Sequence, residues 1–123
     1  MKRVIVESPY GSTDPEIIER NIAYARACLR DCILRGEAPL VSHLLHMQDG
    51  VLRNEIPCGT EAGFVLGQCA DACAEKTVVY IDLGISGDMI NAMERAIKAK
   101  RLIEYRSLGS PWVTDASCEI VQH

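Results

Sequence analysis

The sequence has no long apolar run and no excess of basic residues. No stretch approaches the roughly 20 consecutive apolar residues that a membrane-spanning helix needs. Lys and Arg number 13 against 17 Asp and Glu, for a net charge of −4. This balance argues against polymeric nucleic acid as a partner, because such proteins usually carry a basic surface. The first apolar run stops at Glu7, too early for a signal peptide. We therefore expect a cytoplasmic protein with no membrane partner.

Internal repeats and low-complexity tracts are also absent, so nothing indicates an array or a long linker. The chain of 123 residues fits one domain, and 48% hydrophobic residues are enough for a buried core. We assign residues 1–108 to that domain. Residues 109–123, which contain the single tryptophan, form a tail or arm.

Cysteine, in contrast, is abundant for this length. Disulfides are not expected in a reducing compartment. Two pairs, Cys28/Cys32 and Cys69/Cys73, are spaced i, i+4 and therefore share helix faces. The pairs could ligate a metal or serve as small buried hydrophobes. Zinc sites favour tighter spacings on loops, so we predict the second alternative and no metal.

Strand-like and helix-like segments alternate along the chain. A cap at Asp14 begins the first helix, and Gly36 ends it. Such alternation predicts an α/β fold, with a mainly parallel sheet of four or five strands in three layers. The expected strands are 3–7, 38–45, 77–82 and 101–108, and the expected helices are 15–35, 61–73 and 87–100.

Polar residues follow each predicted strand. In open parallel sheets, ligands bind at the carboxyl ends of the strands, so these residues should lie together. Asp82 could accept hydrogen bonds from ribose hydroxyls, whereas the helix cap is the favoured interpretation of Asp88, because an apolar helical run follows it. Gly84 could supply a positive φ or let a ligand approach the backbone. The candidate ligand-binding residues at strand ends are Ser8, Pro9, Tyr10, His43, Asp82, Gly84, Ile85, Ser86, Asp88, Met89 and Arg106.

Arginine is the natural phosphate ligand, because its guanidinium offers a planar fork of donors. Arg53 in a long connection and Arg106 at a strand end are the better candidates. Arg26 and Arg30 share a helix face, which could bind a phosphate or a partner subunit, or simply face solvent. His43 and His46 lie three residues apart, yet no acidic motif accompanies them.

The segments "VIVESPY", "TVVYIDLGIS" and "MERAIKAKRLIEYRSL" together resemble the nucleoside 2-deoxyribosyltransferase-like families, which are small Rossmann-like proteins. The segments "RNIAYARACLRDCILRGEAPLVSHLL" and "DLGIS…EYRSL" also look like a family of short uncharacterised proteins of phages and bacteria. These resemblances imply a Rossmann-like domain in a bacterial or phage-infected host cell. They further imply a nucleotide ligand.

The transferase chemistry uses a carboxylate that attacks C1′ of the sugar. Matching "KAKRLIEY" to the family motif places Ala92 at that glutamate's position. Glu94 is nearby, but two residues along a helix rotate it by about 200°. Glu94 is therefore either the catalytic carboxylate in a shifted register or an ordinary surface residue.

Three functions follow as expectations. The first is a homo-oligomeric protein that binds a nucleotide, or an ADP-ribose-like or cyclic nucleotide, without turnover. It would sequester a signalling nucleotide, as a phage anti-defence protein could. The second is an enzyme that cleaves or exchanges an N-glycosidic bond through Glu94. The third is a protein-interaction module. None of the three needs a cofactor.

Overall fold

Four short strands pair side by side in the computed structural model, which describes residues 1–41, 44, 74–109 and 112. The order across the sheet is β2-β1-β3-β4, and every pair of neighbours is parallel. The α/β fold predicted from the sequence is therefore confirmed. The strands are β1 (Arg3–Glu7), β2 (Ala38–Leu40), β3 (Lys76–Tyr80) and β4 (Leu102–Arg106).

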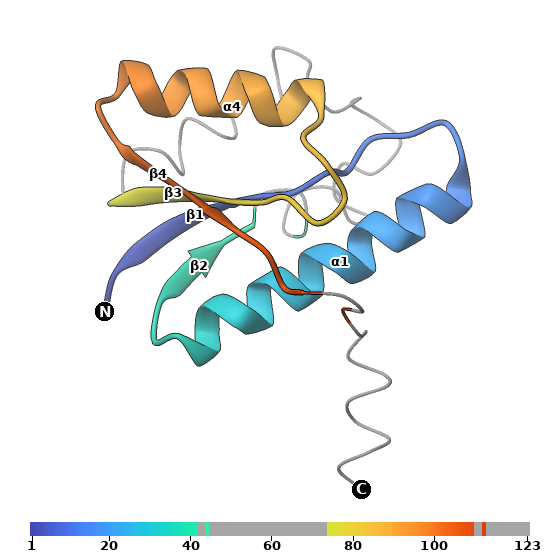
Figure 1. The fold of residues 1–123 in the computed structure, drawn as a ribbon, viewed down its shortest axis with the longest axis horizontal. Coiled ribbons are helices and arrows are strands. Elements are labelled where there is room, and N and C mark those ends of the chain that lie inside the picture. The colour runs from blue at the N-terminus through green and yellow to red at the C-terminus, as the bar shows by residue number, and fades with distance from the viewer. Residues whose placement is uncertain (42–43, 45–73, 110–111, 113–123) are drawn as a thin grey trace, which may run out of the picture.

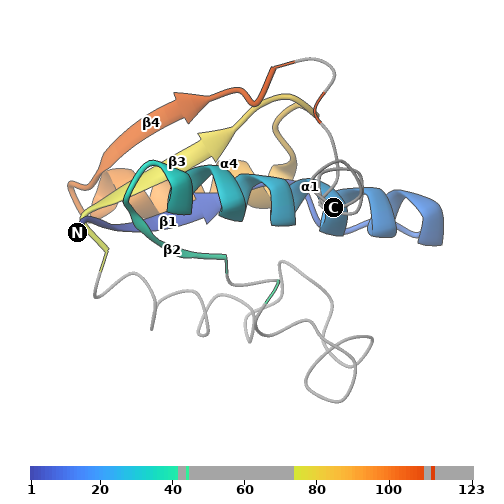
Figure 2. The same ribbon diagram turned by 90° about the horizontal axis from the view of Figure 1, so that it is seen from below.

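Helices cover both faces of this sheet (Figure 1). Helix α1 (Pro15–Leu34) packs on one face of the sheet and contacts β2. Helix α4 (Gly87–Lys98) packs on the opposite face, over β3 and β4. The turned view shows β4 and β2 at the two edges, with β1 and β3 between them (Figure 2). This arrangement gives three layers, as a parallel sheet with its helical crossovers requires.

The ends of α1 follow directly from its sequence. The side chain of Asp14 accepts a hydrogen bond from the Glu16 N–H at 2.9 Å, and Pro15 occupies the first helical position. Both features were predicted, and both suit a helix start because they satisfy or remove backbone donors that lack partners. Just past the helix, Gly36 takes a φ of +82°, which ends the helix as predicted.

The core on the α1 side joins valines of the sheet to one stripe of α1. Alternation along β1 and β3 sends every second side chain to this face. Cys28 and Cys32 are fully buried free thiols in the stripe, and the Cys32 sulfur also lies 3.3 Å from the Tyr80 hydroxyl. Cys69 and Cys73 lie outside the described residues. The cluster consists of Val4, Val6, Tyr24, Ala25, Cys28, Cys32, Val41, Val78 and Tyr80.

The opposite face, on which α4 packs over β3 and β4, carries the buried residues Ile5, Thr77 and Val79. Two of the buried residues of α4, Ala92 and Ala96, are small, so its backbone can approach the sheet closely. Among the described residues, no helix combines the length and apolar character needed to cross a bilayer.

Three strand boundaries differ from the sequence prediction. The strand expected over 38–45 stops at Leu40, and Leu44 is helical, with its N–H bonded to the Val41 carbonyl. Strand β3 stops at Tyr80, two residues early, because a turn closed by Gly84 and Ile81 begins there. Strand β4 likewise ends at Arg106. The helix expected over 61–73 lies outside the described residues.

Candidate functional site

The sheet reverses its direction of growth between β1 and β3. From β1 the chain passes through α1 on one face to β2, whereas from β3 it passes through α4 on the other face to β4. The loops that follow β1 and β3 therefore leave adjacent strands toward opposite faces. Such a switch point is where open α/β sheets bind ligands. It is the feature that defines the candidate site.

Strand register brings the two predicted loops to the same edge. Glu7 is opposite Val79, so Ser8 and Pro9 leave β1 at the level where β3 ends. Ser8 and Pro9 are buried, and Tyr10 is partly buried. The loop is fixed by a residue that the sequence reading missed. Asn21 of α1, only 2% exposed, donates its amide N–H to the Tyr10 carbonyl at 3.0 Å.

Asp82 lies at the centre of this edge, in the turn after β3. Its carboxylate accepts hydrogen bonds from the Tyr24 hydroxyl at 2.5 Å and the Ser107 hydroxyl at 2.6 Å. It also accepts from the backbone N–H groups of Leu108 and Gly109, at 2.9 and 3.2 Å. Partial burial acts to raise the pKa of Asp82, but the hydrogen bonds outweigh it and the pKa is lowered.

Tyr24 is the second residue of the candidate site that the sequence did not reveal. It lies fully buried on the core face of α1, and no sequence motif marks it. Its hydroxyl donates to the Asp82 carboxylate and accepts the Asp82 backbone N–H at 2.9 Å. Burial, together with the hydrogen bond to Asp82, raises the pKa of Tyr24 well above its usual value. The phenol therefore stays protonated and keeps its donor.

The turn between β3 and α4 contains the predicted glycine and serine. Gly84 has a φ of +87°, which explains the glycine as a backbone requirement. Ser86, rather than Asp88, caps α4, so the cap prediction for Asp88 is wrong. The Ser86 hydroxyl accepts from the Met89 N–H, and the Met89 sulfur accepts from the Ser86 N–H, both at 3.3 Å. Asp88 lies in the first helical turn instead.

Arg106 ends β4 as expected, but its guanidinium is engaged inside the protein. It is 6% exposed and forms a bidentate pair with Glu37, at 2.7 and 2.6 Å. A further hydrogen bond joins it to Glu104. Lys76 contacts the same two carboxylates at 3.1 and 2.8 Å. We call these four residues the ion-pair cluster.

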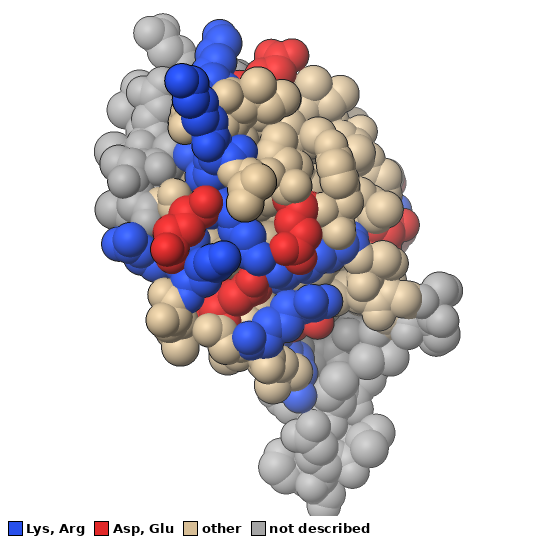
Figure 3. Space-filling model, turned by 60° about the vertical axis from the view of Figure 1, so that its left-hand side comes forward, with Lys and Arg blue, Asp and Glu red and all other residues tan. Residues whose placement is uncertain are grey.

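The ion-pair cluster is electrically balanced, with two cations and two carboxylates. Hydrogen bonds from Arg106 and, secondarily, Lys76 lower the pKa of Glu37 to about 2 despite its burial. The same two donors lower the pKa of Glu104 to about 2. Charges of both signs also alternate on the face toward the amino ends of the strands (Figure 3). This region shows no single-sign patch for a phosphate.

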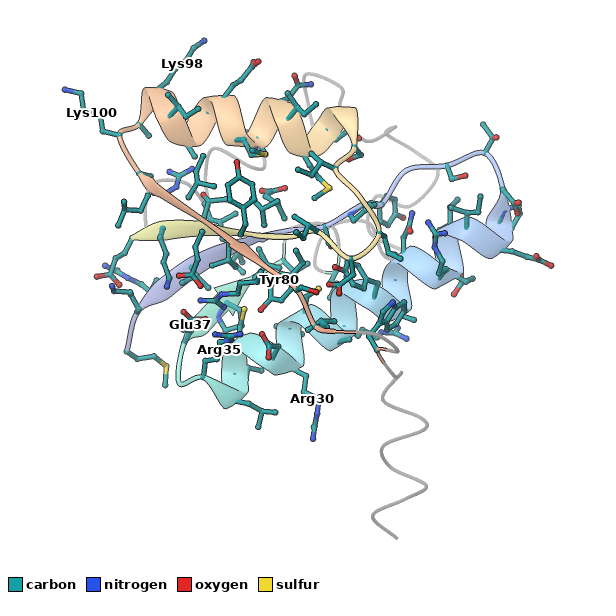
Figure 4. The ribbon with its side chains drawn as sticks, in the orientation of Figure 1. Arg30, Arg35, Glu37, Tyr80, Lys98 and Lys100 are labelled. Atoms are coloured by element: carbon teal, nitrogen blue, oxygen red, sulfur yellow. The ribbon has the colours of Figure 1, made fainter. Side chains whose placement is uncertain are left out.

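The remaining predicted residues are spread over the surface. Arg26 and Arg30 are exposed on α1, and Arg30 points away from the helix, whereas Glu37 and Tyr80 lie on the α1 side of the sheet (Figure 4). Ile85 is exposed, at 44%. His43, His46 and Arg53 lie outside the described residues.

Glu94, the candidate nucleophile, is exposed on α4, while Ala92 is buried. Glu94 lies seven positions after the helix start at Gly87, or about 10 Å along the axis. Glu94 therefore faces solvent and lies away from the edge of the sheet at which the strands end. Within the described ranges, no group of three His, Cys, Asp or Glu residues is placed to hold a metal ion.

Comparison with protein families places most of the chain in a known family. The family model described as "Domain of unknown function (DUF7768)" matches residues 2–106, which include every strand of the sheet. No curated protein and no solved structure matches the chain. The family description names no transferase, so the resemblance to the nucleoside 2-deoxyribosyltransferase-like families stays a prediction.

Proposed function

Because the chain belongs to the DUF7768 family, a domain of unknown function, we propose its role from the site itself. It binds a ribose-containing nucleotide or ADP-ribose-like ligand at the carboxyl edge between β1 and β3. The observation that carries the proposal is the switch point, where the Ser8–Tyr10 loop and the Asp82 turn leave adjacent strands.

The chemistry of this edge favours a sugar. An ionised carboxylate only accepts hydrogen bonds, and the lowered pKa keeps Asp82 ionised at neutral pH. Ribose hydroxyls are matching donors. Tyr10, partly exposed on the neighbouring loop, offers an aromatic face for a base. The turn from Gly84 to Ser86 precedes the N-terminus of α4, where backbone N–H groups favour a phosphate.

Binding without turnover is the form that the geometry supports. The candidate nucleophile, Glu94, is exposed on α4 and stands about 10 Å along the helix from its N-terminus. We leave Arg106 out of the binding set, because its donors bind Glu37 and Glu104. A binder of this kind, most simply a homo-oligomer, would sequester a signalling nucleotide, as in phage anti-defence.

The test is a thermal-shift panel of AMP, ADP, ADP-ribose, cyclic ADP-ribose and cyclic di-AMP. A ligand at 100 times its dissociation constant should add about 2.7 kcal/mol of stability. Asp82→Asn should remove the shift, while Glu19→Gln, which neutralises an exposed carboxylate on α1, should retain it. Mass spectrometry should recover the ligand intact. A shift that survives Asp82→Asn would contradict the assignment, and a cleaved product would favour N-glycosidic bond cleavage.

A further inference from the structure

The segment after β4 folds back onto Asp82. Ser107, Leu108 and Gly109 follow the last strand residue directly, and each donates a hydrogen bond to the Asp82 carboxylate. Farther along, the Trp112 ring stands edge-on against Tyr24, with ring centroids 5.1 Å apart. We call these four residues, Ser107, Leu108, Gly109 and Trp112, the C-terminal strap.

The contacts of the strap fall on the same two residues that define the site. Tyr24 holds Asp82 from α1, and the strap holds both of them from the end of β4. A carboxylate has about four positions at which it accepts hydrogen bonds. Tyr24, Ser107, Leu108 and Gly109 are four donors to it. A ribose hydroxyl can therefore reach Asp82 only by replacing one of these donors.

We propose that the C-terminal strap competes with the ligand: it occupies Asp82 in the free protein and leaves when a nucleotide binds. This inference rests on the proposed function and adds a mode of regulation to the same site. The strap mimics the ligand chemically, since Ser107 presents a hydroxyl where ribose would. The backbone N–H groups of Leu108 and Gly109 occupy further acceptor positions of the Asp82 carboxylate.

The strap lies outside the sheet, and two of its side chains, Leu108 and Trp112, pack against the core on the α1 side. Ser107 and Gly109 are exposed, and all of its members lie beyond the last residue of β4. Tyr24 remains hydrogen-bonded to Asp82 when the strap leaves, so the carboxylate keeps its position. Because only the strap-free fraction binds, apparent affinity falls in proportion to the strapped population. Weakening the strap should therefore strengthen binding.

The first experiment examines the strap without any ligand. The amide protons of Leu108 and Gly109 should exchange slowly in the wild type and at least tenfold faster in Asp82→Asn, which weakens their acceptor. Trp112 is the single tryptophan, so its emission should shift to the red in the same variant. Equal exchange in both proteins would overturn the anchoring, whatever the function.

The second experiment adds the nucleotide panel to Ser107→Ala. This variant removes one competitor and should bind about tenfold more tightly than the wild type. Tyr105→Phe, which deletes an exposed hydroxyl two residues earlier, should bind as the wild type does. On binding, the Leu108 and Gly109 amides should lose protection.

The outcomes separate the two proposals. Binding that leaves the Leu108 and Gly109 amides protected would overturn the strap and keep the nucleotide site. Equal affinity of Ser107→Ala and wild type would do the same. If no member of the panel binds either protein, the proposed function fails, and the strap is then a structural closure of the Asp82 turn.

Discussion

Arg106 was predicted to bind a ligand because it ends a strand, but in the structure its side chain stabilises the fold. Its guanidinium extends from the end of β4 to Glu37, which precedes β2, and to Glu104 on its own strand. A planar donor fork beside two carboxylates holds the two edges of the α1 face together. The cost of this arrangement is desolvation, which only complete pairing offsets.

Removing the guanidinium should therefore be costly. Arg106→Leu leaves Glu37 nearly buried, at 10% side-chain exposure, with only Lys76 as a partner. We expect the free energy of unfolding to fall by about 3 kcal/mol or more, measured by urea denaturation. Arg26→Leu, at an exposed position on α1, should change it by less than about 0.5 kcal/mol. Similar losses in the two variants would argue against a structural role for the ion-pair cluster.

Tyr24 invites the corresponding test at the site. Tyr24→Phe keeps the ring against Trp112 but deletes a hydroxyl that bonds both the carboxylate and the N–H of Asp82. Unfolding free energy should drop by about 1–3 kcal/mol, because a partly buried N–H loses its acceptor. Tyr105→Phe removes a hydroxyl at 55% residue exposure and serves as the control. Equal stability of both variants would contradict the hydrogen-bond assignment.

At the scale of elements, the end of α4 departs from the usual choice of residue. Lys100 has a φ of +57°, in the left-handed region where glycine is normally found. Its N–H bonds the Ile97 carbonyl at 3.0 Å, and the Arg101 N–H bonds the Ala96 carbonyl at 2.9 Å. These bonds close the helix tightly and let β4 begin only two residues later.

A glycine should relieve this strain. Lys100→Gly should raise the unfolding free energy by about 1 kcal/mol, since a side chain in this region costs about that much. Ala99→Gly, where φ is −82°, should instead lower it by about 0.5–1 kcal/mol. Thermal unfolding of both variants measures the contrast. A loss of stability in Lys100→Gly would contradict it.

Helices and strands were predictable from the sequence where neighbouring residues determine them. Their ends were predicted less accurately. Asp14 and Gly36 mark α1 correctly because a cap and a positive φ are properties of a few adjacent residues. The end of β3 was misplaced, since hydrophobicity continues through Ile81 while the chain already turns. Likewise, the sequence prediction placed the cap of α4 at Asp88, whereas Ser86 is the cap. Only the geometry of the turn decides between them.

For the whole molecule, the sequence predicted the parallel α/β fold but not which side chains bind one another between its elements. Alternating elements imply parallel strands, and that much is confirmed. The carboxyl-edge rule correctly brought the Ser8 loop and the Asp82 turn together. It could not foresee that Asp82 would bind Tyr24, or Arg106 would bind Glu37. Those contacts join residues that are distant in sequence, so they depend on the complete sheet order.

Acid should destabilise the molecule in a defined window. The pKa values of Glu37 and Glu104 are about 2, because Arg106 and Lys76 donate to them, against an ordinary 4.5. A carboxylate whose pKa is lower in the folded state stabilises the fold at any pH above its ordinary pKa. That stabilisation disappears as the pH falls toward 2. The urea midpoint should therefore decrease between about pH 5 and pH 2. Glu37→Gln should flatten this decrease, and an unchanged slope would contradict it.

The central position of β1 has a consequence for how the protein is made. The strand Arg3–Glu7 is synthesised early, yet its partner β3 comes more than sixty residues later, as the pairing of Val4 with Lys76 shows. Translation at about 5–20 residues per second leaves the first strand waiting for seconds on the ribosome. During that interval β1 can pair only with the short strand β2, and its side toward β3 stays open, so Val4, Ile5 and Val6 are incompletely covered. Chaperones that shield emerging apolar segments should therefore increase the yield of folded protein.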